Sequence, residues 1–291
     1  MKILVIGASG MLGGSITRYL SKTKKYEVLS TVRTESQKKV LNEWGIKNVK
    51  SCININCDDM SNLEKIVKEF KPQYIINCVG IIKQLDTKIN IDEYIEINSI
   101  LPHKLSLIGD KYNAKLIHFS TDCVFSGLVG NYVESDMVDA KDIYGKTKYL
   151  GEINNPYHLT LRTSIIGHEV NRKISLIDWF LAQNKTVNGF TKAFFTGMPS
   201  VYIAEILHKE ILNRGNITGL YHLGVNPIDK YTLLNIVKKQ YNKKIEIIKN
   251  NDYKINRSLN SNKIKKIIKQ DEKSWEELIK KMHNEYKEYY A

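Results

Sequence analysis

The sequence contains no apolar run long enough to cross a membrane. A membrane-spanning helix needs about 20 consecutive apolar residues, and the apolar beginning of this chain, "MKILVIGASG", is soon interrupted by glycines. The same segment has no small-residue cleavage site of the kind that ends a secretory signal. We therefore expect a soluble protein that stays in the cytoplasm.

Cysteine is also scarce, and its spacing excludes two classes of site. The four cysteines never occur as CxxC pairs. Cys78 lies in the strand-like run "YIINCVG", where a thiol serves as a small hydrophobic side chain. We expect neither a disulfide framework nor a bound metal.

Arginine is rare, so the net charge of +13 comes from lysine. Only six of the 44 basic residues are arginines, and the lysines are dispersed along the chain. The densest group, "NSNKIKKIIKQ", alternates charge with isoleucine at helical spacing, as a solvated helix face does. No zinc finger, basic zipper or RNA-binding aromatic motif accompanies the charge. We therefore expect no nucleic-acid partner, and the positive charge is explained equally well by anionic small-molecule ligands.

Short apolar runs alternate with amphipathic stretches in the first half of the chain. The runs "KILVIG", "YEVLSTV", "YIINCVG" and "KLIHFST" have the composition of buried strands, and the stretches between them have helical periodicity. This alternation predicts an α/β fold with a doubly wound parallel sheet. We place the sheet domain at 1–167, with a late strand returning near 219–224, and a smaller region at 168–291.

The segment "GASGMLGG" follows the first predicted strand directly and opens a helix. Its glycines have the spacing GxxGxxG, which lets the backbone turn tightly and approach a pyrophosphate closely. Free backbone N–H groups at the helix start then face that anion. We predict that this loop binds a dinucleotide; the alternative is a merely tight strand-to-helix turn. The loop residues expected to contact the cofactor are Gly7, Ser9, Gly10, Met11, Leu12 and Gly13.

The residue after the second strand indicates which dinucleotide binds. NAD enzymes place an acidic residue there for the ribose 2′-hydroxyl, whereas a 2′-phosphate requires a cation. The sequence has Arg33 in this place, which favours NADP(H). The alternative is an ordinary surface arginine, because Glu35 is close.

Asp58 follows the third predicted strand and is expected to accept a hydrogen bond from the adenine amino group. The alternative is that the acidic pair at 58–59 only supports a helix start, since Ser61 and Glu64 have the spacing of a capping box.

Thr121, Tyr144 and Lys148 form the predicted catalytic group. Thr121 ends the strand "KLIHFST" at the edge where parallel sheets bind ligands. Tyr144 and Lys148 are four residues apart, so on a helix they share one face. We expect the Lys148 ammonium to lower the pKa of the Tyr144 phenol and to hold the cofactor ribose, while Thr121 orients a substrate carbonyl. This arrangement suits carbonyl reduction; the alternative is an ordinary neighbour pair on a lysine-rich helix.

Seven short motifs run through most of the chain. They are "GASGMLG", "INCVGII", "INSILPHKL", "HFSTDCVFSG", "YGKTKYLGE", "LRTSIIG" and "GLYHLG". In this order they resemble the extended short-chain dehydrogenases/reductases, and most closely the dTDP-4-dehydrorhamnose reductase (RmlD-like) family. The resemblance implies an NADP(H)-binding Rossmann domain at 1–167 and mainly a substrate-binding region at 168–291.

The resemblance also implies roles for residues outside the catalytic group. Val79 and Gly80 would line the cofactor, and Asn98 would support the active-site backbone. Arg257 resembles the late arginine of the family that meets the nucleotide phosphates. The residues expected to contact the substrate are Lys83, Thr121, Asp122, Cys123, Arg162, Ser164 and Arg257.

Some segments depart from the common pattern of the family. Cys123 and Ser126 replace the tyrosine and the acid of the usual "STDYVFDG", which bears on the substrate. The motif "VGIIKQ", which contains Lys83, resembles the corresponding segment of relatives that reduce UDP-linked 2-acetamido-2,6-dideoxy-4-ketohexoses. Lys83 is therefore a candidate substrate contact, and the alternative is that it is a surface lysine. Phe194 and Phe195 are candidates to stack on a pyrimidine base, with packing inside the second region as the alternative.

The resemblance implies NADPH-dependent reduction of the C4 keto group of a nucleotide-linked 4-keto-6-deoxyhexose in activated deoxysugar and polysaccharide biosynthesis. The expected substrate is of the UDP-2-acetamido-2,6-dideoxy-4-ketohexose or the dTDP-4-dehydrorhamnose type, and the resemblance is compatible with a homodimer. Two rivals remain open. One is a sugar-nucleotide epimerase or dehydratase that retains NAD, and the other is a non-catalytic regulatory subunit of the same fold. Arg33 weighs against the first, and the intact catalytic group weighs against the second.

Overall fold

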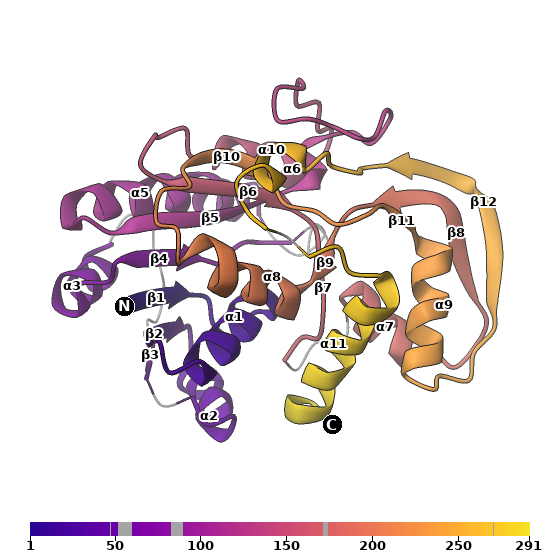
Figure 1. Cartoon of the computed structure of the whole chain (residues 1–291), viewed down its shortest axis with the longest axis horizontal. Helices are drawn as coiled ribbons and strands as arrows, with labels where there is room; N and C mark the ends of the chain where they lie inside the picture. Colours follow the sequence, from indigo (N-terminus) through magenta and orange to yellow (C-terminus); the bar gives the residue numbers. More distant parts are fainter. Residues whose placement is uncertain (47, 52–59, 83–89, 171–173, 270) are drawn as a thin grey trace.

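The central element of the fold is a seven-stranded parallel sheet with the order β10-β6-β5-β4-β1-β2-β3 (Figure 1). This computed structural model describes residues 1–46, 48–51, 60–82, 90–170, 174–269 and 271–291. The chain begins in the middle of the sheet and winds outward in both directions, which confirms the doubly wound arrangement expected from the sequence. The strands of the sheet are β1 (Lys2–Ile6), β2 (Glu27–Val32), β3 (Val49–Ser51), β4 (Tyr74–Asn77), β5 (Lys115–Thr121), β6 (Leu159–Thr163) and β10 (Gly219–His222).

Helices cover both faces of this sheet, because alternate side chains of each strand point to opposite sides. The helices are α1 (Met11–Lys22), α2 (Glu35–Glu43), α3 (Ser61–Phe70), α4 (Ile91–Tyr94), α5 (Leu101–Tyr112), α6 (Ile143–Leu150), α7 (Leu176–Ala182), α8 (Ser200–Ile206), α9 (Lys230–Gln240), α10 (Asn262–Lys265) and α11 (Trp275–Tyr289). Ile3 and Val5 of β1 pack in one hydrophobic cluster with α1 and α8. Leu4 and Ile6 pack in another with α3 and α5. The sheet is therefore packed against apolar side chains on both faces.

One helix start differs from the sequence-based alternative. α3 begins at Ser61 itself, with Met60 in the cap position, so Ser61 and Glu64 do not form a capping box. The Glu64 carboxylate instead accepts hydrogen bonds from Lys111 and Tyr112 of α5, at 2.6 and 2.9 Å. A tertiary contact between two helices has replaced the local cap.

A second lobe lies beside the sheet and contains two small sheets (Figure 1). One consists of β11 (Ile228–Asp229), β8 (Val187–Phe195) and β12 (Ile247–Asn256), with α9 packed on β8, and the other of β7 (Ile165–Ile166) and β9 (Met198–Pro199). The chain crosses between the lobes more than once, because α8 packs on α1 and β10 pairs with β6. Across the described ranges, none of the helices is long and apolar enough to traverse a bilayer.

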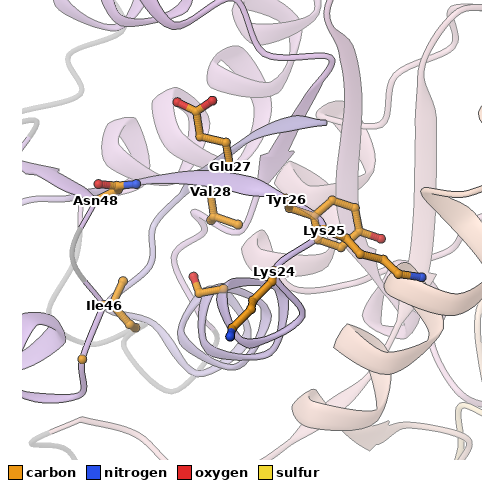
Figure 2. Close-up of a pocket in the computed structure, with 9 residues that line it drawn as sticks. Lys24, Lys25, Tyr26, Glu27, Val28, Ile46 and Asn48 are labelled. Atoms are coloured by element: carbon orange, nitrogen blue, oxygen red, sulfur yellow. The ribbon is translucent and has the colours of Figure 1, made fainter.

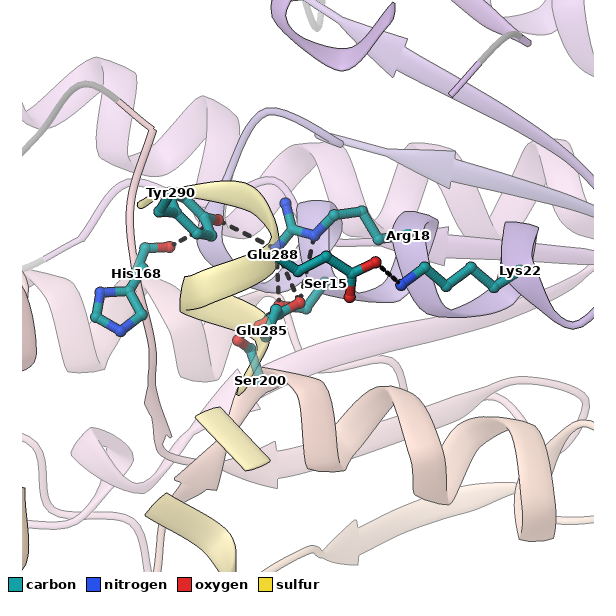
Figure 3. Close-up of polar contacts among 8 residues, drawn as sticks. All are labelled: Ser15, Arg18, Lys22, His168, Ser200, Glu285, Glu288 and Tyr290. Atoms are coloured by element: carbon teal, nitrogen blue, oxygen red, sulfur yellow. Dashed lines mark hydrogen bonds and ion pairs between the residues drawn. The ribbon is translucent and has the colours of Figure 1, made fainter. Parts of the chain in front are cut away.

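The C-terminal helix α11 joins the two lobes through a buried ion pair (Figure 3). Arg18 of α1 donates to the Glu285 carboxylate at 2.9 Å, and their side chains are only 2% and 7% exposed. Ser15 donates to the same carboxylate at 3.0 Å and lies 2.8 Å from the Ser200 hydroxyl of α8. The Trp44 ring covers the guanidinium at 4.6 Å from its centroid. The helix that follows the glycine loop is thereby fixed to the end of the described chain.

Candidate active site

The glycine loop after β1 has the geometry that a closely approaching anion requires. Gly7 has φ +86°, a left-handed conformation that L side chains rarely adopt. A Cβ on Gly13 would lie 2.2 Å from the Gly7 carbonyl oxygen, so only glycine lets α1 start this close to the strand end. Gly10 is the exposed N-cap residue of α1 and Ser9 is half-buried, whereas the Leu12 side chain packs into the core. Met11, the first residue of α1, lies against Gly167 where the chain leaves the sheet.

Arg33 lies directly after β2 at the same edge of the sheet, and it is exposed. Its backbone N–H donates to the Gln37 side chain at 3.0 Å, while the Thr34 hydroxyl caps α2 by accepting from the Gln37 N–H at 3.2 Å. These two bonds fix the turn that carries Arg33. Asp58 and Lys83 lie outside the described residues.

A hollow elsewhere on the surface is not part of this edge (Figure 2). Its lining includes Lys24, Tyr26, Glu27 and Asn48, which lie around the beginning of β2. Strand beginnings and strand ends lie at opposite edges of a parallel sheet, so this hollow faces away from the candidate site.

Asn98 braces the loop that follows β4. It lies in the π-helical turn η2 (Ile95–Ile100), where its side-chain oxygen accepts from the Ile81 N–H at 2.9 Å and its amide donates to the Ile81 carbonyl at 3.0 Å. The Val79 N–H donates to the Asn77 side chain at 3.1 Å, and a Cβ on Gly80 would meet the Asn98 oxygen at 3.4 Å. Asn98 thus holds the backbone beside Val79 and Gly80, as the family resemblance implied.

Thr121 and Tyr144 meet at the carboxyl end of β5. The Thr121 hydroxyl lies close enough to the Tyr144 phenol to affect its pKa, and it also accepts from the Cys123 N–H at 3.1 Å. Asp142 caps α6 by accepting from the Gly145 N–H at 2.8 Å, which places Tyr144 in the first turn. A Cβ on Gly145 would lie 2.2 Å from the Cys123 carbonyl oxygen, so this glycine lets α6 approach the strand end.

Lys148 lies one turn after Tyr144 but does not act on the phenol as the sequence suggested. Its ammonium donates to the Phe119 carbonyl oxygen at 2.6 Å, and burial lowers its pKa to about 8. Burial also raises the pKa of the Tyr144 phenol, against the opposing effect of the Thr121 hydrogen bond. The expected lowering of the tyrosine pKa by Lys148 is therefore wrong for the free protein. At neutral pH the phenol is protonated.

Asp122 and Cys123 begin η3 (Asp122–Val124), directly after Thr121. Asp122 is buried and accepts from the Thr121 hydroxyl at 3.2 Å, and its pKa is raised by burial. Burial and the Asp122 charge raise the pKa of the Cys123 thiol to about 12, so the thiol is uncharged at neutral pH. Arg257 donates to the Cys123 sulfur at 3.6 Å and to the Phe125 carbonyl at 3.0 Å. Three of the predicted substrate residues thus lie together beside Thr121.

Arg162 does not reach this surface, which corrects its expected contact with substrate. It is 2% exposed, and its guanidinium forms two hydrogen bonds of 2.7 Å with the Glu152 carboxylate. The same carboxylate accepts from Ser120 at 2.7 Å, and the Arg162 guanidinium lies 5.2 Å from the Phe125 ring centroid. Arg162 therefore supports β5 and β6 from inside the fold.

Ser164 is half-buried between β6 and β7, and its carbonyl accepts from the Met198 N–H at 3.0 Å. Of the two predicted stacking residues, Phe195 is buried, with its ring centroid 5.7 Å from that of Trp275. Phe194 is 36% exposed. Packing thus accounts for Phe195, and Phe194 is the exposed member of the pair.

Lys230 is a charged neighbour of the site that the sequence analysis missed. It is the first residue of α9 in the second lobe, and its ammonium lies 3.4 Å from the Phe195 ring centroid. Asp122 and Cys123 both act on its pKa. The available local signal was a lysine directly after the helix cap Asp229, where the helix dipole disfavours a cation.

Comparison with known proteins gives a single family. The family model described as the RmlD substrate binding domain matches residues 1–288. A dTDP-4-dehydrorhamnose reductase of Aggregatibacter actinomycetemcomitans is 26% identical over 78% of this chain and 74% of that protein. Methionine adenosyltransferase 2 subunit beta of Xenopus tropicalis is 25% identical over 77% of this chain and 67% of that protein.

Solved structures give the same architecture. The crystal structure of dTDP-4-dehydrorhamnose reductase from Bacillus anthracis in complex with NADP superimposes with a TM-score of 0.78. It is 19% identical, and the match covers 98% of both chains. At this identity the likeness shows the fold, a Rossmann-type sheet with a second lobe.

Proposed function

This chain belongs to the RmlD substrate binding domain family, and from that premise we propose that it is an NADPH-dependent sugar-nucleotide 4-ketoreductase. The observation that carries the proposal is that Tyr144 lies near Thr121 at the end of β5, in the helix that also carries the buried ammonium of Lys148. This group lies at the carboxyl edge of a parallel sheet, the edge that also carries the glycine loop. A donor and a cofactor cradle thus face the same space.

The cradle fits a dinucleotide with a 2′-phosphate. The strained φ of Gly7 and the close approach at Gly13 leave room for a pyrophosphate at the start of α1. Arg33 would pair with the 2′-phosphate, and Val79 and Gly80 would lie along the nicotinamide half. NADPH, when bound, supplies the hydride.

The residues of the chain supply the proton and the orientation. Tyr144 donates its phenolic proton to the oxygen of the substrate ketone as that oxygen becomes negative. Thr121, whose only O–H donates to Asp122 in the free protein, would redirect that hydrogen bond to the same oxygen and fix the carbonyl. Burial keeps the Tyr144 pKa above its ordinary value, so the phenol carries the proton that reduction consumes. Lys148, whose ammonium donates to the Phe119 carbonyl in the free protein, would hold the cofactor ribose.

The proposed substrate is a pyrimidine-nucleotide-linked 4-keto-6-deoxyhexose, either dTDP-linked or UDP-linked with a 2-acetamido group. Relatives named dTDP-4-dehydrorhamnose reductase support the dTDP form. The argument for the UDP form depends on Lys83, outside the described residues. Arg257 is the proposed phosphate-binding residue. We assign cofactor binding to 1–167 with β10, and substrate binding mainly to 168–291.

One assay tests this function. The protein is mixed with NADPH and either a dTDP-linked or a UDP-linked 4-keto-6-deoxyhexose, and the loss of NADPH absorbance is followed. We expect turnover with at least one nucleotide sugar and little with the free ketosugar. NADPH binding without consumption of any ketosugar would support a regulatory subunit instead. An NAD that remains bound after desalting would indicate the epimerase or dehydratase alternative.

A further inference from the structure

Lys230 occupies a position that is unfavourable for a lysine without a ligand. It is the first residue of α9, where the positive end of the helix dipole opposes its charge. The side chain is half-buried, and burial lowers the pKa of its ammonium to about 8. Asp229 caps the helix by accepting from the Thr232 N–H at 2.9 Å, and this cap does not depend on which side chain occupies position 230. The fold of α9 therefore does not require a cation here.

The ammonium of Lys230 has an aromatic neighbour but no acceptor. Within the described part of the chain, it forms no ion pair and no hydrogen bond, and it lies over the Phe195 ring. Asp122 is the carboxylate that acts on its pKa, yet the two groups are not in ion-pair contact. Arg257 also acts on Asp122 while donating to Phe125 and Cys123. Lys230 and Arg257 thus both lie near the buried Asp122 carboxylate, but neither forms an ion pair with it among the residues that the structure describes.

This arrangement directly adjoins the proposed reaction centre. Asp122 accepts a hydrogen bond of 3.2 Å from the Thr121 hydroxyl, and that hydroxyl lies close enough to the Tyr144 phenol to affect its pKa. A ligand group between Lys230 and Asp122 therefore lies next to the ketone that Tyr144 would protonate. The ketone's near neighbours are substituents of its own ring, whereas the diphosphate is attached across that ring.

We propose that Lys230 binds the hexose ring of the substrate by donating a charge-assisted hydrogen bond to a ring substituent oxygen opposite Asp122. The proposal rests on the sugar-nucleotide function proposed above. An ammonium has three donors and no acceptor, so a hydroxyl or an acetamido carbonyl completes it, while Asp122 accepts from a second hydroxyl. Lys230 is then a specificity residue supplied by the second lobe, and Arg257 is left for the phosphates.

Binding of an unreactive sugar nucleotide tests this role without turnover. dTDP-glucose, UDP-N-acetylglucosamine and the bare nucleotides dTDP and UDP are titrated by calorimetry into the NADP-loaded protein. Three variants are compared with the parent: Lys230→Met, Lys230→Arg and the control Lys239→Met on the exposed side of α9. Lys230→Met should weaken the sugar nucleotide by roughly 10- to 100-fold, the usual effect of losing one charge-assisted hydrogen bond. The same variant should change the affinity for dTDP and UDP by less than about twofold. Lys230→Arg should retain most of the affinity for the sugar nucleotide, and Lys239→Met should bind it as the parent does.

Several results would overturn the ring contact. Equal weakening of the bare nucleotide would move Lys230 to the diphosphate, and no weakening of either ligand would leave only packing against Phe195. A parent that binds both sugar nucleotides no better than the bare nucleotides would also refute it. Unchanged NADPH affinity shows that each variant is folded. A parent that binds sugar nucleotides through Lys230 yet reduces no ketosugar would refute the proposed reaction and leave this inference standing.

Discussion

The Lys148 ammonium donates its hydrogen bond to the Phe119 carbonyl oxygen, at 2.6 Å, within the strand that ends in Thr121. The lysine is therefore held by the backbone of β5 and does not lower the pKa of the phenol one turn before it. In the free protein the phenol is a protonated donor. The acid that we propose for reduction is thus protonated before substrate binds.

Tyr144→Phe should reduce the rate of ketosugar reduction by on the order of 10² to 10⁴, because the ring and the helix remain while the proton is lost. Affinity for the nucleotide sugar should change little. Steady-state kinetics measures the first and calorimetry the second. Tyr149→Phe, in the same helix but 44% exposed, is the control and should match the parent. A Tyr144→Phe enzyme within about threefold of the parent would refute the assignment.

Lys148→Met should lose activity and gain stability at neutral pH. The variant removes the charge that we propose holds the cofactor ribose, so kcat/KM should fall by at least about tenfold. It also removes the cost of burying an ammonium, so the free energy of unfolding should rise by about 1 kcal/mol or more. A variant that is both slower and less stable in urea would contradict this reasoning.

The stability gain of Lys148→Met should depend on pH in a defined window. Burial lowers the folded-state pKa of Lys148 to about 8, below its unfolded value. Below pH 8 the lysine is charged in both states, and the burial penalty is complete. Between about 8 and about 10.4 the folded protein loses the proton first, so the penalty declines as pH rises. Urea unfolding should show a smaller difference in the free energy of unfolding between the parent and Lys148→Met at pH 10 than at pH 7.

Arg33→Ala should remove most of the preference for NADPH over NADH. A charge-assisted bond to the 2′-phosphate contributes about 1.5 to 3 kcal/mol, or roughly one to two decades in the ratio of kcat/KM values. The ratio is measured with both cofactors at saturating ketosugar. Lys39→Ala, on the exposed side of the following helix, is the matched control. An unmodified protein that uses both cofactors equally would exclude this role of Arg33.

Glu285→Gln should destabilise the protein by about 3 kcal/mol, because it leaves the Arg18 guanidinium buried without its counter-charge. The chain offers a matched control on the same two helices. Lys22 of α1 pairs with Glu288 of α11, and both side chains are about half exposed. Glu288→Gln should therefore cost less than about 1 kcal/mol. Equal losses in thermal or urea unfolding would show that burial does not distinguish the two pairs.

The parts of the site that the sequence predicted are those encoded locally. The glycine loop and the Tyr144–Lys148 spacing depend on a few neighbouring residues, and backbone sterics or helix periodicity fix their geometry. Asn98 came from the family resemblance, and its bonds to Ile81 give that role a physical basis. The doubly wound parallel sheet followed from strand and helix alternation, whereas the sequence analysis did not predict the order of the strands.

The parts that the sequence missed depend on contacts between distant segments. Arg162 has the same local motif whether it faces substrate or Glu152, and only the tertiary placement of Glu152, in the loop after α6, decides between them. Lys148 was expected to tune Tyr144. Its ammonium instead donates to the Phe119 carbonyl of β5, a contact that the spacing of residues in α6 does not reveal. Lys230 comes near Asp122 only when the second lobe packs against the end of the sheet.

The Arg18–Glu285 pair also sets an order of events during synthesis. Glu285 follows Arg18 by 267 residues, so at 5 to 20 residues per second it emerges roughly 15 to 50 s later. Until then Arg18 lacks its buried ion-pair partner, and α1 lacks the packing that α11 provides. We expect the N-terminal half of the nascent chain to remain protease-sensitive until α11 has left the ribosome.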